Sequence, residues 1–186
     1  MKVLLTSAGL NNDLLADFFV KTMEMDMQNV KALFITAAAN NPDAVEVLPK
    51  CLNDLLKVGI IRENIVVYDM HIGLSPEELQ AFDVIYICGG STAYLLKRMK
   101  RTGFDISLRA YIEAGGYVLG VSAGSIALVS NYEEGLGILD CCLQVHCAQG
   151  DAMGEPDLKL QKTLRLTNEQ AIYCNGQKAV IYGEEG

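Results

Sequence analysis

The sequence predicts a single-domain α/β fold with three layers, α/β/α, built around a mostly parallel, doubly wound sheet that ends in a C-terminal β-hairpin. Short, continuous apolar stretches alternate with segments whose apolar residues recur every three or four positions, the pattern of buried strands separated by amphipathic helices. Strands and helices in this alternation form right-handed βαβ units, whose helices cover both faces of the sheet. Asn175-Gly176 lies between two apolar stretches and is the strongest short signal for a hairpin.

The first half of the chain supplies three strands and three helices. Residues 2–6 and 31–35 are apolar strands, and residues 14–24 between them have helical periodicity. Asn41-Pro42 is typical of an N-cap followed by proline at the first helical position. The helix that follows carries one apolar stripe, formed by Leu48, Cys51, Leu52, Leu55 and Leu56. The third strand, at residues 65–68, is rich in β-branched residues, and Ser75 to Glu78 form a capping box that begins a short helix ending at Ala81.

The second half continues the alternation as far as the closing hairpin. A fourth strand ends at the Gly89-Gly90 pair, and Ser91 is placed to cap the next helix. The expected elements are a strand at 84–88, helices at 92–101 and 106–114, a strand at 117–121, a helix at 125–129, and hairpin strands at 171–173 and 179–182. In such sheets the reactive groups collect at the carboxyl ends of the strands, here just after Thr6, Ile35, Cys88 and Val121.

Length and composition fit one globular domain covering residues 1–186. Of the 186 residues 51% are apolar and 20% are charged, which excludes a disordered chain. The 15 Lys and Arg against 23 Asp and Glu give a formal charge of −8, so we expect no nucleic-acid and no membrane partner. The apolar N-terminal stretch is too short for a signal peptide, and no run reaches the ~18 residues of a membrane span. A cytoplasmic monomer or homodimer is expected.

Cysteine and histidine are distributed in a way that argues against a metal site. None of the six cysteines forms a C-x-x-C pair, and the chain has two histidines. A zinc site needs better-spaced ligands, so we expect reduced, buried thiols and no metal or organic cofactor.

The strand at 117–121 leads into Gly120-Val121-Ser122-Ala123-Gly124, a G-x-S-x-G sequence. Between a strand and a helix, this motif is typical of a nucleophile elbow, in which small flanking residues allow a sharp turn that exposes the serine hydroxyl. The alternative is a purely structural glycine-rich turn in which the serine has no catalytic role. The elbow hypothesis makes Ser122 the candidate nucleophile.

A serine nucleophile needs a base and an oxyanion hole. His146 follows the elbow and is the candidate base, whereas His71 follows the third strand and is expected to be a bystander. The N–H of Ala123 is one expected oxyanion donor, and Gly89 or Gly90 is expected to supply the second.

The pairing of Cys88-Gly89-Gly90-Ser91-Thr92 with an elbow about thirty residues later resembles the peptidase E family, serine aspartyl dipeptidases whose fold is similar to that of class I glutamine amidotransferases. The resemblance extends from the first strand to the closing hairpin. It implies a cofactor-free serine peptidase that hydrolyses short peptides, in particular dipeptides with N-terminal aspartate, with Ser122 as nucleophile and His146 as base.

This chain departs from the family between elbow and histidine. The family has a longer segment there, which carries its acidic residue, whereas here Glu133 or Glu134 would have to orient His146. The alternative for both glutamates is a solvated acidic turn. Two other functions remain open: a catalytically impaired member that binds a small ligand or a partner, and a hydrolase of another amide or ester.

Overall fold

The structure, a computed structural model, describes residues 1–130, 135–158, 163–176 and 178–184. Seven strands form the main sheet: β1 (Lys2–Thr6), β2 (Ala32–Ile35), β3 (Ile65–Tyr68), β4 (Val84–Ile87), β5 (Tyr117–Val121), β8 (Gln170–Asn175) and β9 (Lys178–Gly183). Their order across the sheet is β3-β2-β4-β5-β1-β8-β9. The first five strands are parallel, and the hairpin formed by β8 and β9 adds antiparallel to β1. The expected mostly parallel sheet with a C-terminal hairpin is confirmed.

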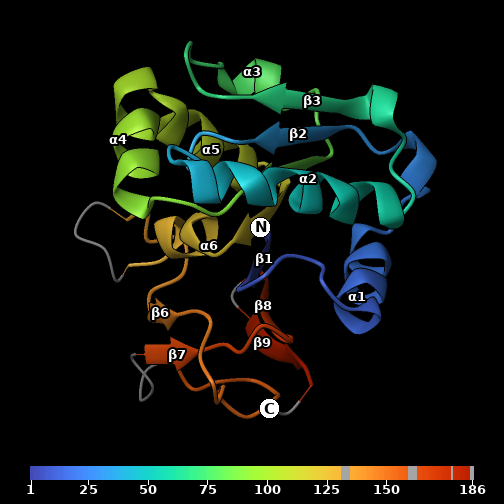
Figure 1. The fold of residues 1–186 in the computed structure, drawn as a ribbon, viewed down its shortest axis with the longest axis vertical. Coiled ribbons are helices and arrows are strands. Elements are labelled where there is room, and N and C mark those ends of the chain that lie inside the picture. The colour runs from blue at the N-terminus through green and yellow to red at the C-terminus, as the bar shows by residue number, and fades with distance from the viewer. Residues whose placement is uncertain (131–134, 159–162, 177, 185–186) are drawn as a thin grey trace.

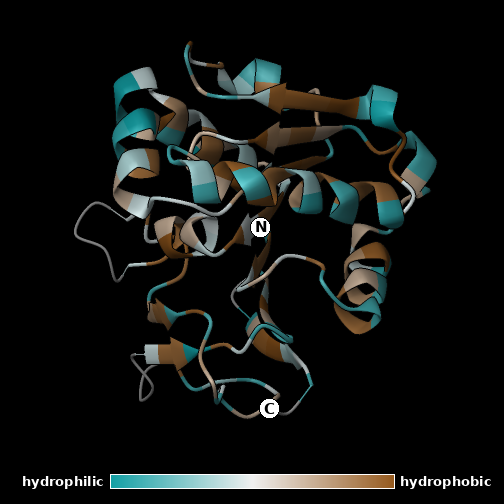
Figure 2. Ribbon diagram, in the orientation of Figure 1, coloured by the Kyte–Doolittle hydropathy of each residue, from teal (hydrophilic) through white to brown (hydrophobic). Residues whose placement is uncertain are grey.

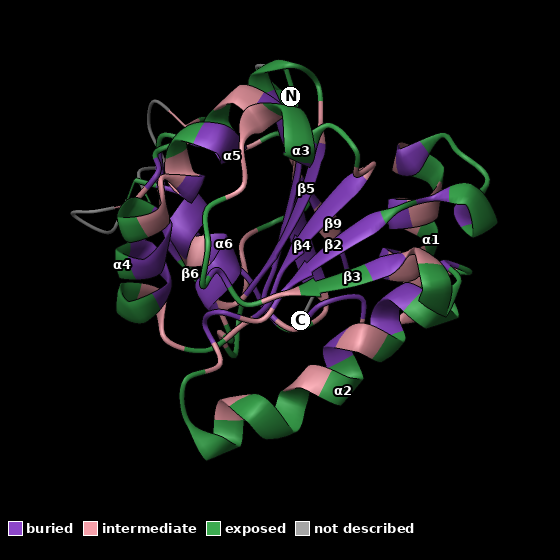
Figure 3. Cartoon of the chain, turned by 90° about the horizontal axis from the view of Figure 1, so that it is seen from above, coloured by how far each residue is buried: buried purple, intermediate pink, exposed green. Residues whose placement is uncertain are grey.

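The helices form the two outer layers (Figure 1). They are α1 (Asp13–Met23), α2 (Pro42–Lys57), α3 (Pro76–Leu79), α4 (Thr92–Thr102), α5 (Phe104–Glu113) and α6 (Ala123–Leu128), with single 3₁₀ turns at Met27–Asn29 and Arg62–Asn64. Buried residues of α1 and α2 pack against one face of the sheet, and those of α3 to α6 against the other, as the view from above shows (Figure 3). The doubly wound, three-layer arrangement therefore follows the prediction.

The alternation of side chains along β1 shows how the sheet separates the two cores. Val3 and Leu5 lie in the core under α3 to α6, whereas Leu4, between them, lies in the core under α1 and α2. All three are at most 1% exposed, which explains why the strand is apolar without interruption. Figure 2 shows the same contrast between predominantly apolar strands and the mixed surface of α2.

The helix starts marked by capping signals agree with the structure, whereas α5 begins at Phe104, two residues before the expected start at 106, and α6 also begins early. The side chains of Asn41, Ser75 and Ser91 each accept a backbone N–H at the start of a helix, as predicted. The helix expected at 125–129 instead begins at Ala123. Ser122 is the single residue between the end of β5 and the start of α6, and its backbone turns sharply enough to connect them. That turn is analysed below with the site.

A second, two-stranded sheet was not expected from the sequence. It consists of β6 (Cys142–Gln144) and β7 (Thr163–Arg165), which pair in parallel beside the C-terminal part of the main sheet (Figure 1). Three-residue strands are too short to show a clear period-two pattern, so sequence reasoning had little signal here. Within the described ranges, no helix is both long enough and apolar enough to cross a bilayer.

A buried carboxyl group fixes α2 against the sheet. Asp54 in α2 is 5% exposed, and its Oδ2 accepts hydrogen bonds from the N–H of Leu10, at 3.0 Å, and from the hydroxyl of Tyr86, at 2.8 Å. These bonds tie α2 to the loop after β1 and to β4. Burial raises the pKa of the Asp54 carboxyl above its ordinary value of 3.8, against the smaller opposing effect of the two donors.

We predict that Asp54 makes the folded protein less stable as pH rises. A carboxyl whose pKa is higher in the folded state contributes stability below its unfolded-state pKa and loses it as pH rises through the folded-state pKa. Asp54→Asn cannot ionise but keeps an acceptor oxygen for Leu10. Urea unfolding should therefore show the wild type losing free energy of unfolding relative to Asp54→Asn as pH rises from 3.8 to neutrality.

The control for this prediction is Asp17→Asn, which removes an exposed carboxylate on α1. A pH-dependent difference of the same size in Asp17→Asn would contradict the prediction, because it would show a general effect of charge and not of burial. A difference between the wild type and Asp54→Asn that does not change with pH would contradict the prediction.

Candidate active site

Ser122 lies at the junction between β5 and α6, and its backbone has a conformation that residues other than glycine rarely adopt. Its φ is 50° and its ψ is −110°, and its N–H donates to the carbonyl of Thr6 at 2.9 Å. Such a conformation costs about 1–3 kcal/mol and persists where the surroundings enforce it. The result is the expected strand–turn–helix elbow, with the Ser122 side chain at the carboxyl edge of the sheet.

Two glycines allow the elbow to pack. A Cβ on Gly124 would lie 2.3 Å from the carbonyl oxygen of Ile87, and one on Gly120 would lie 2.9 Å from the backbone nitrogen of Ser125. In both cases the obstructing atom belongs to the backbone, so it cannot move aside as a flexible side chain would. The close approach of α6 to β4 and β5 therefore requires glycine on both sides of Ser122.

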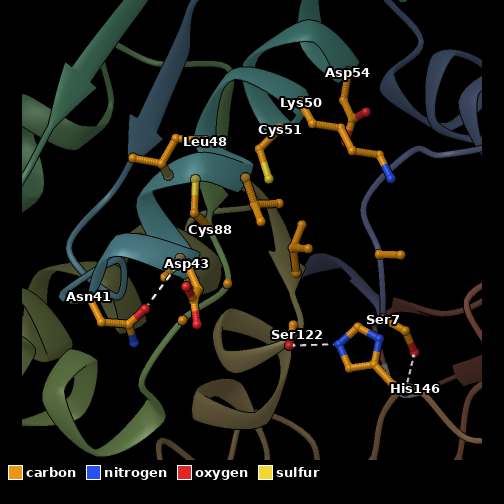
Figure 4. A pocket seen from close by; sticks show the side chains of 16 residues that line it. Ser7, Asn41, Asp43, Leu48, Lys50, Cys51, Asp54, Cys88, Ser122 and His146 are labelled. Carbon is orange, nitrogen blue, oxygen red and sulfur yellow. Dashed lines mark hydrogen bonds between the residues drawn. The ribbon is translucent and has the colours of Figure 1, made fainter.

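His146 lies beside Ser122, as Figure 4 shows. Its Nε2 is 3.0 Å from the Oγ of Ser122, within the distance at which a base can take a hydroxyl proton. His146 follows β6 in a segment without regular structure and has a φ of 57°, unusual for a residue other than glycine. The structure thus brings the predicted nucleophile and the predicted base into hydrogen-bond contact.

The other ring nitrogen of His146 faces Asn168, which sequence reasoning missed. The Oδ1 of Asn168 is 2.7 Å from the Nδ1 of His146. An amide oxygen accepts only, so in this arrangement Nδ1 carries the hydrogen and Nε2 is left free to accept from Ser122. Asn168 sits in the loop just before β8, where Gln170 accepts the N–H of Thr167 at 3.1 Å and holds the loop.

Two of the candidate oxyanion residues, Ala123 and Gly89, lie next to Ser122. Ala123 is the first residue of α6, so its N–H is one of the donors that a helix leaves without an intrahelical partner. Gly89 lies directly opposite, since a Cβ built on it would be 3.3 Å from the Cβ of Ser122 and 3.8 Å from its Oγ. Gly90 has a separate requirement for glycine: its φ is 138°, and a Cβ there would lie 2.1 Å from the carbonyl oxygen of Ala38.

The remaining sequence candidates lie elsewhere. His71 sits near the end of β3, where its Nε2 is 2.8 Å from the carboxylate of Asp69 and its Nδ1 is 2.9 Å from Nη2 of Arg98. It does not line the pocket at Ser122. Glu133 and Glu134, the two carboxylates expected to orient His146, fall outside the described residues.

A cavity of about 480 Å³ opens between α2 and the carboxyl ends of β1, β4 and β5. Ser122 and His146 lie at one end of its lining, and Asp54, Cys51 and Lys50 on α2 extend the lining away from them (Figure 4). Apolar side chains such as Val47, Leu48 and Val121 also line the cavity. A cavity of this size accommodates one or two amino-acid residues next to Ser122.

Two thiols contribute to the cavity lining. A hydrogen bond from Cys88 lowers the pKa of the Cys51 thiol, whereas burial raises the pKa of Cys88 well above its ordinary value. Each of the six cysteines is unpaired. No group of three or more His, Cys, Asp or Glu side chains in the described part of the chain is arranged to hold a metal ion.

Comparison with known proteins shows where the chain belongs. A model of the family described as Peptidase family S51 matches residues 3–137. A protein of Listeria monocytogenes that is named as an uncharacterized peptidase is 29% identical over 108 residues, or 58% of this chain and 53% of that protein. The chain thus spans about half the length of the curated relatives it matches.

Solved structures match over nearly the whole chain. A protein from Listeria monocytogenes described as a peptidase E candidate superposes with a TM-score of 0.76, covering 99% of this chain and 98% of that one at 19% identity. A peptidase from an acI-B1 Actinobacterium superposes with a TM-score of 0.63 at 16% identity, covering 98% of this chain and 87% of that one. At these identities the matches establish a shared fold.

The packing at the elbow predicts a large cost for one added methyl group. Gly124→Ala should lose about 3 kcal/mol of unfolding free energy, because the backbone oxygen of Ile87 has no room to yield. The control is Gly103→Ala, at a helix end with φ 71° and open space around the position, where alanine should cost about 1 kcal/mol from backbone strain alone. Chemical denaturation of both variants tests the difference, and equal losses would contradict it.

Proposed function

The chain belongs to peptidase family S51, and on that premise we propose that it is a serine-type peptidase in which Ser122 is the nucleophile and His146 the general base. One observation carries the proposal: the continuous hydrogen-bonded relay from Ser122 Oγ to His146 Nε2, at 3.0 Å, and from His146 Nδ1 to Asn168 Oδ1, at 2.7 Å. Nucleophile, base and orienting group are the three parts that nucleophilic catalysis by serine requires.

Each residue has a defined part in the proposed reaction. His146 Nε2 takes the proton of the Ser122 hydroxyl as Oγ attacks the scissile carbonyl, and it returns that proton to the leaving amine. The N–H groups of Gly89 and Ala123 hold the negative charge that develops on the carbonyl oxygen. Water activated by His146 then hydrolyses the acyl-enzyme, releasing the second product.

Asn168 replaces the expected carboxylate with a neutral amide. Its oxygen keeps His146 in the tautomer with hydrogen on Nδ1, which is the orienting part of a triad acid's role. It adds no negative charge to stabilise the imidazolium that forms when His146 takes the proton. An asparagine in this place also occurs in Cys-His-Asn proteases, so an amide is sufficient for the orienting role.

Short peptides with N-terminal aspartate are the proposed substrates, as the resemblance to peptidase E implies. A carboxylate side chain bound in the cavity calls for a cation, and among the described residues Lys50 is the one lysine or arginine that lines it. Asp43 and Asp54 also line the cavity and offer counter-charges for a free amino group. The relay favours this hydrolase over a catalytically impaired member of the family, because that alternative rested on the lack of an evident residue to orient His146.

The first prediction of this proposal concerns Ser122. Ser122→Ala should abolish turnover of Asp-X dipeptides and labelling by a fluorophosphonate probe, because no other group supplies the attacking oxygen. Ser75→Ala, which removes a hydroxyl that caps α3 away from the cavity, should keep both. Turnover that survives Ser122→Ala would refute the nucleophile, and equal rates on Asp-X, Ala-X and Lys-X peptides would refute the aspartate preference alone.

The second prediction separates the orienting role of Asn168 from a merely structural one. Asn168→Ala should lower kcat on the order of 10²-fold, since His146 loses the partner that fixes its tautomer. Asn168→Asp should keep substantial activity but move the acid limb of the kcat/KM profile to higher pH, because an added negative charge favours the protonated imidazole. The pH–rate profiles of the three proteins test this, and an unshifted limb in Asn168→Asp would count against it.

A further inference from the structure

Ser7 is the first residue after β1, and its buried hydroxyl joins two loops of the site. The residue is 1% exposed. Its Oγ accepts a hydrogen bond from the N–H of His146 at 3.2 Å, visible in Figure 4, and donates one to the carbonyl of Leu166 at 3.2 Å. One hydroxyl therefore connects the segment that carries His146 to the segment that carries Asn168.

The neighbours of Ser7 extend this connection to the nucleophile. The carbonyl of Thr6, the preceding residue, accepts the N–H of Ser122 at 2.9 Å. Leu166, which accepts from Ser7, lies two residues before Asn168 and also accepts the N–H of Cys147 at 3.0 Å. The last residue of β1 and the one that follows it thus contact all three segments of the relay.

The segment around His146 needs such an anchor because it has little regular structure of its own. Residues 145–151 contain neither helix nor strand, and His146 itself adopts a φ of 57°. A residue other than glycine holds this conformation at a cost, and only if its surroundings determine it. The bond to Ser7 fixes the backbone at the very residue whose side chain must stay within about 3 Å of Ser122.

We propose that Ser7 is a positioning residue that sets the His146 imidazole between Ser122 and Asn168. The expected effect of Ser7 on kcat rests on the proposed function. The expected effect of Ser7 on the position of the His146 ring does not depend on turnover. A hydroxyl is required because the position must accept from one backbone N–H and donate to one backbone carbonyl at the same time. Alanine leaves both groups without this partner, whereas threonine keeps the hydroxyl.

Kinetics on Asp-X dipeptides provide the first measurement. Ser7→Ala should lower kcat by about 10- to 100-fold, because a displacement of ~1 Å in a catalytic group costs up to about 10²-fold in rate. KM should change less than twofold, because the cavity wall is otherwise intact. Ser7→Thr should restore most of the lost kcat. Ser107→Ala, which removes another buried serine hydroxyl in α5 away from the cavity, is the matched control and should leave kcat unchanged.

Imidazole NMR signals provide the second measurement, which needs no activity. With two histidines in the chain, the ring signals of His146 are assigned by their loss in His146→Gln. Ser7→Ala should shift and broaden the His146 ring signals and leave those of His71 unchanged, because His71 is held separately by Asp69 and Arg98. Ser7→Thr should return the His146 signals toward their original positions.

The outcomes distinguish this inference from the proposed function. Unchanged kcat and unchanged His146 signals in a folded Ser7→Ala protein would overturn the role of Ser7. Shifts of equal size at His146 and His71 would also overturn it, since they indicate a general loss of structure. If Ser122→Ala keeps full turnover, the proposed function fails, and a selective shift at His146 in Ser7→Ala still supports the positioning role.

Discussion

Ser122 is held at φ 50° and ψ −110° between a strand that ends at Val121 and a helix that begins at Ala123, and the geometry of the site depends on this one turn. Because Ser122 alone separates the strand from the helix, α6 lies so close to β4 and β5 that Gly120 and Gly124 have no room for a Cβ. The same turn directs the hydroxyl of Ser122 to the edge of the sheet and leaves the N–H of Ala123 pointing out of the helix. His146, Gly89 and the cavity all lie next to that hydroxyl.

Much of this arrangement can be predicted from the sequence, because the sequence patterns that indicate it involve residues close together in the chain. The five parallel strands show as continuous apolar stretches, including the edge strand β3, in which Val66 and Val67 are exposed, and Asn175-Gly176 marks the hairpin. Once the strands are parallel, their carboxyl ends share an edge, so residues that follow Thr6, Cys88 and Val121 must lie close together. The elbow then indicates Ser122 as the candidate nucleophile, and the scarcity of histidine leaves His146 as the candidate base nearest in sequence. The family match over residues 3–137 includes the elbow but ends before His146.

Asn168, the third member of the proposed relay, could not be predicted from the position at which the family carries an acid, between the elbow and the histidine. Asn168 is neutral and follows His146, in the loop that precedes β8. A topological signal was nevertheless present. Since β8 runs antiparallel to β1, its first residues lie at the carboxyl edge of the parallel strands, where Ala171 pairs with Thr6. A polar residue just before the hairpin is therefore delivered to the site, although neither its type nor its spacing reveals this. The short strands β6 and β7 gave even less signal.

The pairing of β1 with β8 also bears on the order in which the sheet and the candidate site are completed. Lys2 pairs with Asn175, so one edge of β1 stays open until residues 170–175 have been synthesised. A growing chain contains β1, β5 and the Ser122 elbow well before it contains the loops with His146 and Asn168. Until the hairpin adds to β1, the sheet presents an unpaired strand edge that invites aggregation. The addition of the hairpin thus covers the exposed edge and also brings the loop with Asn168 to His146.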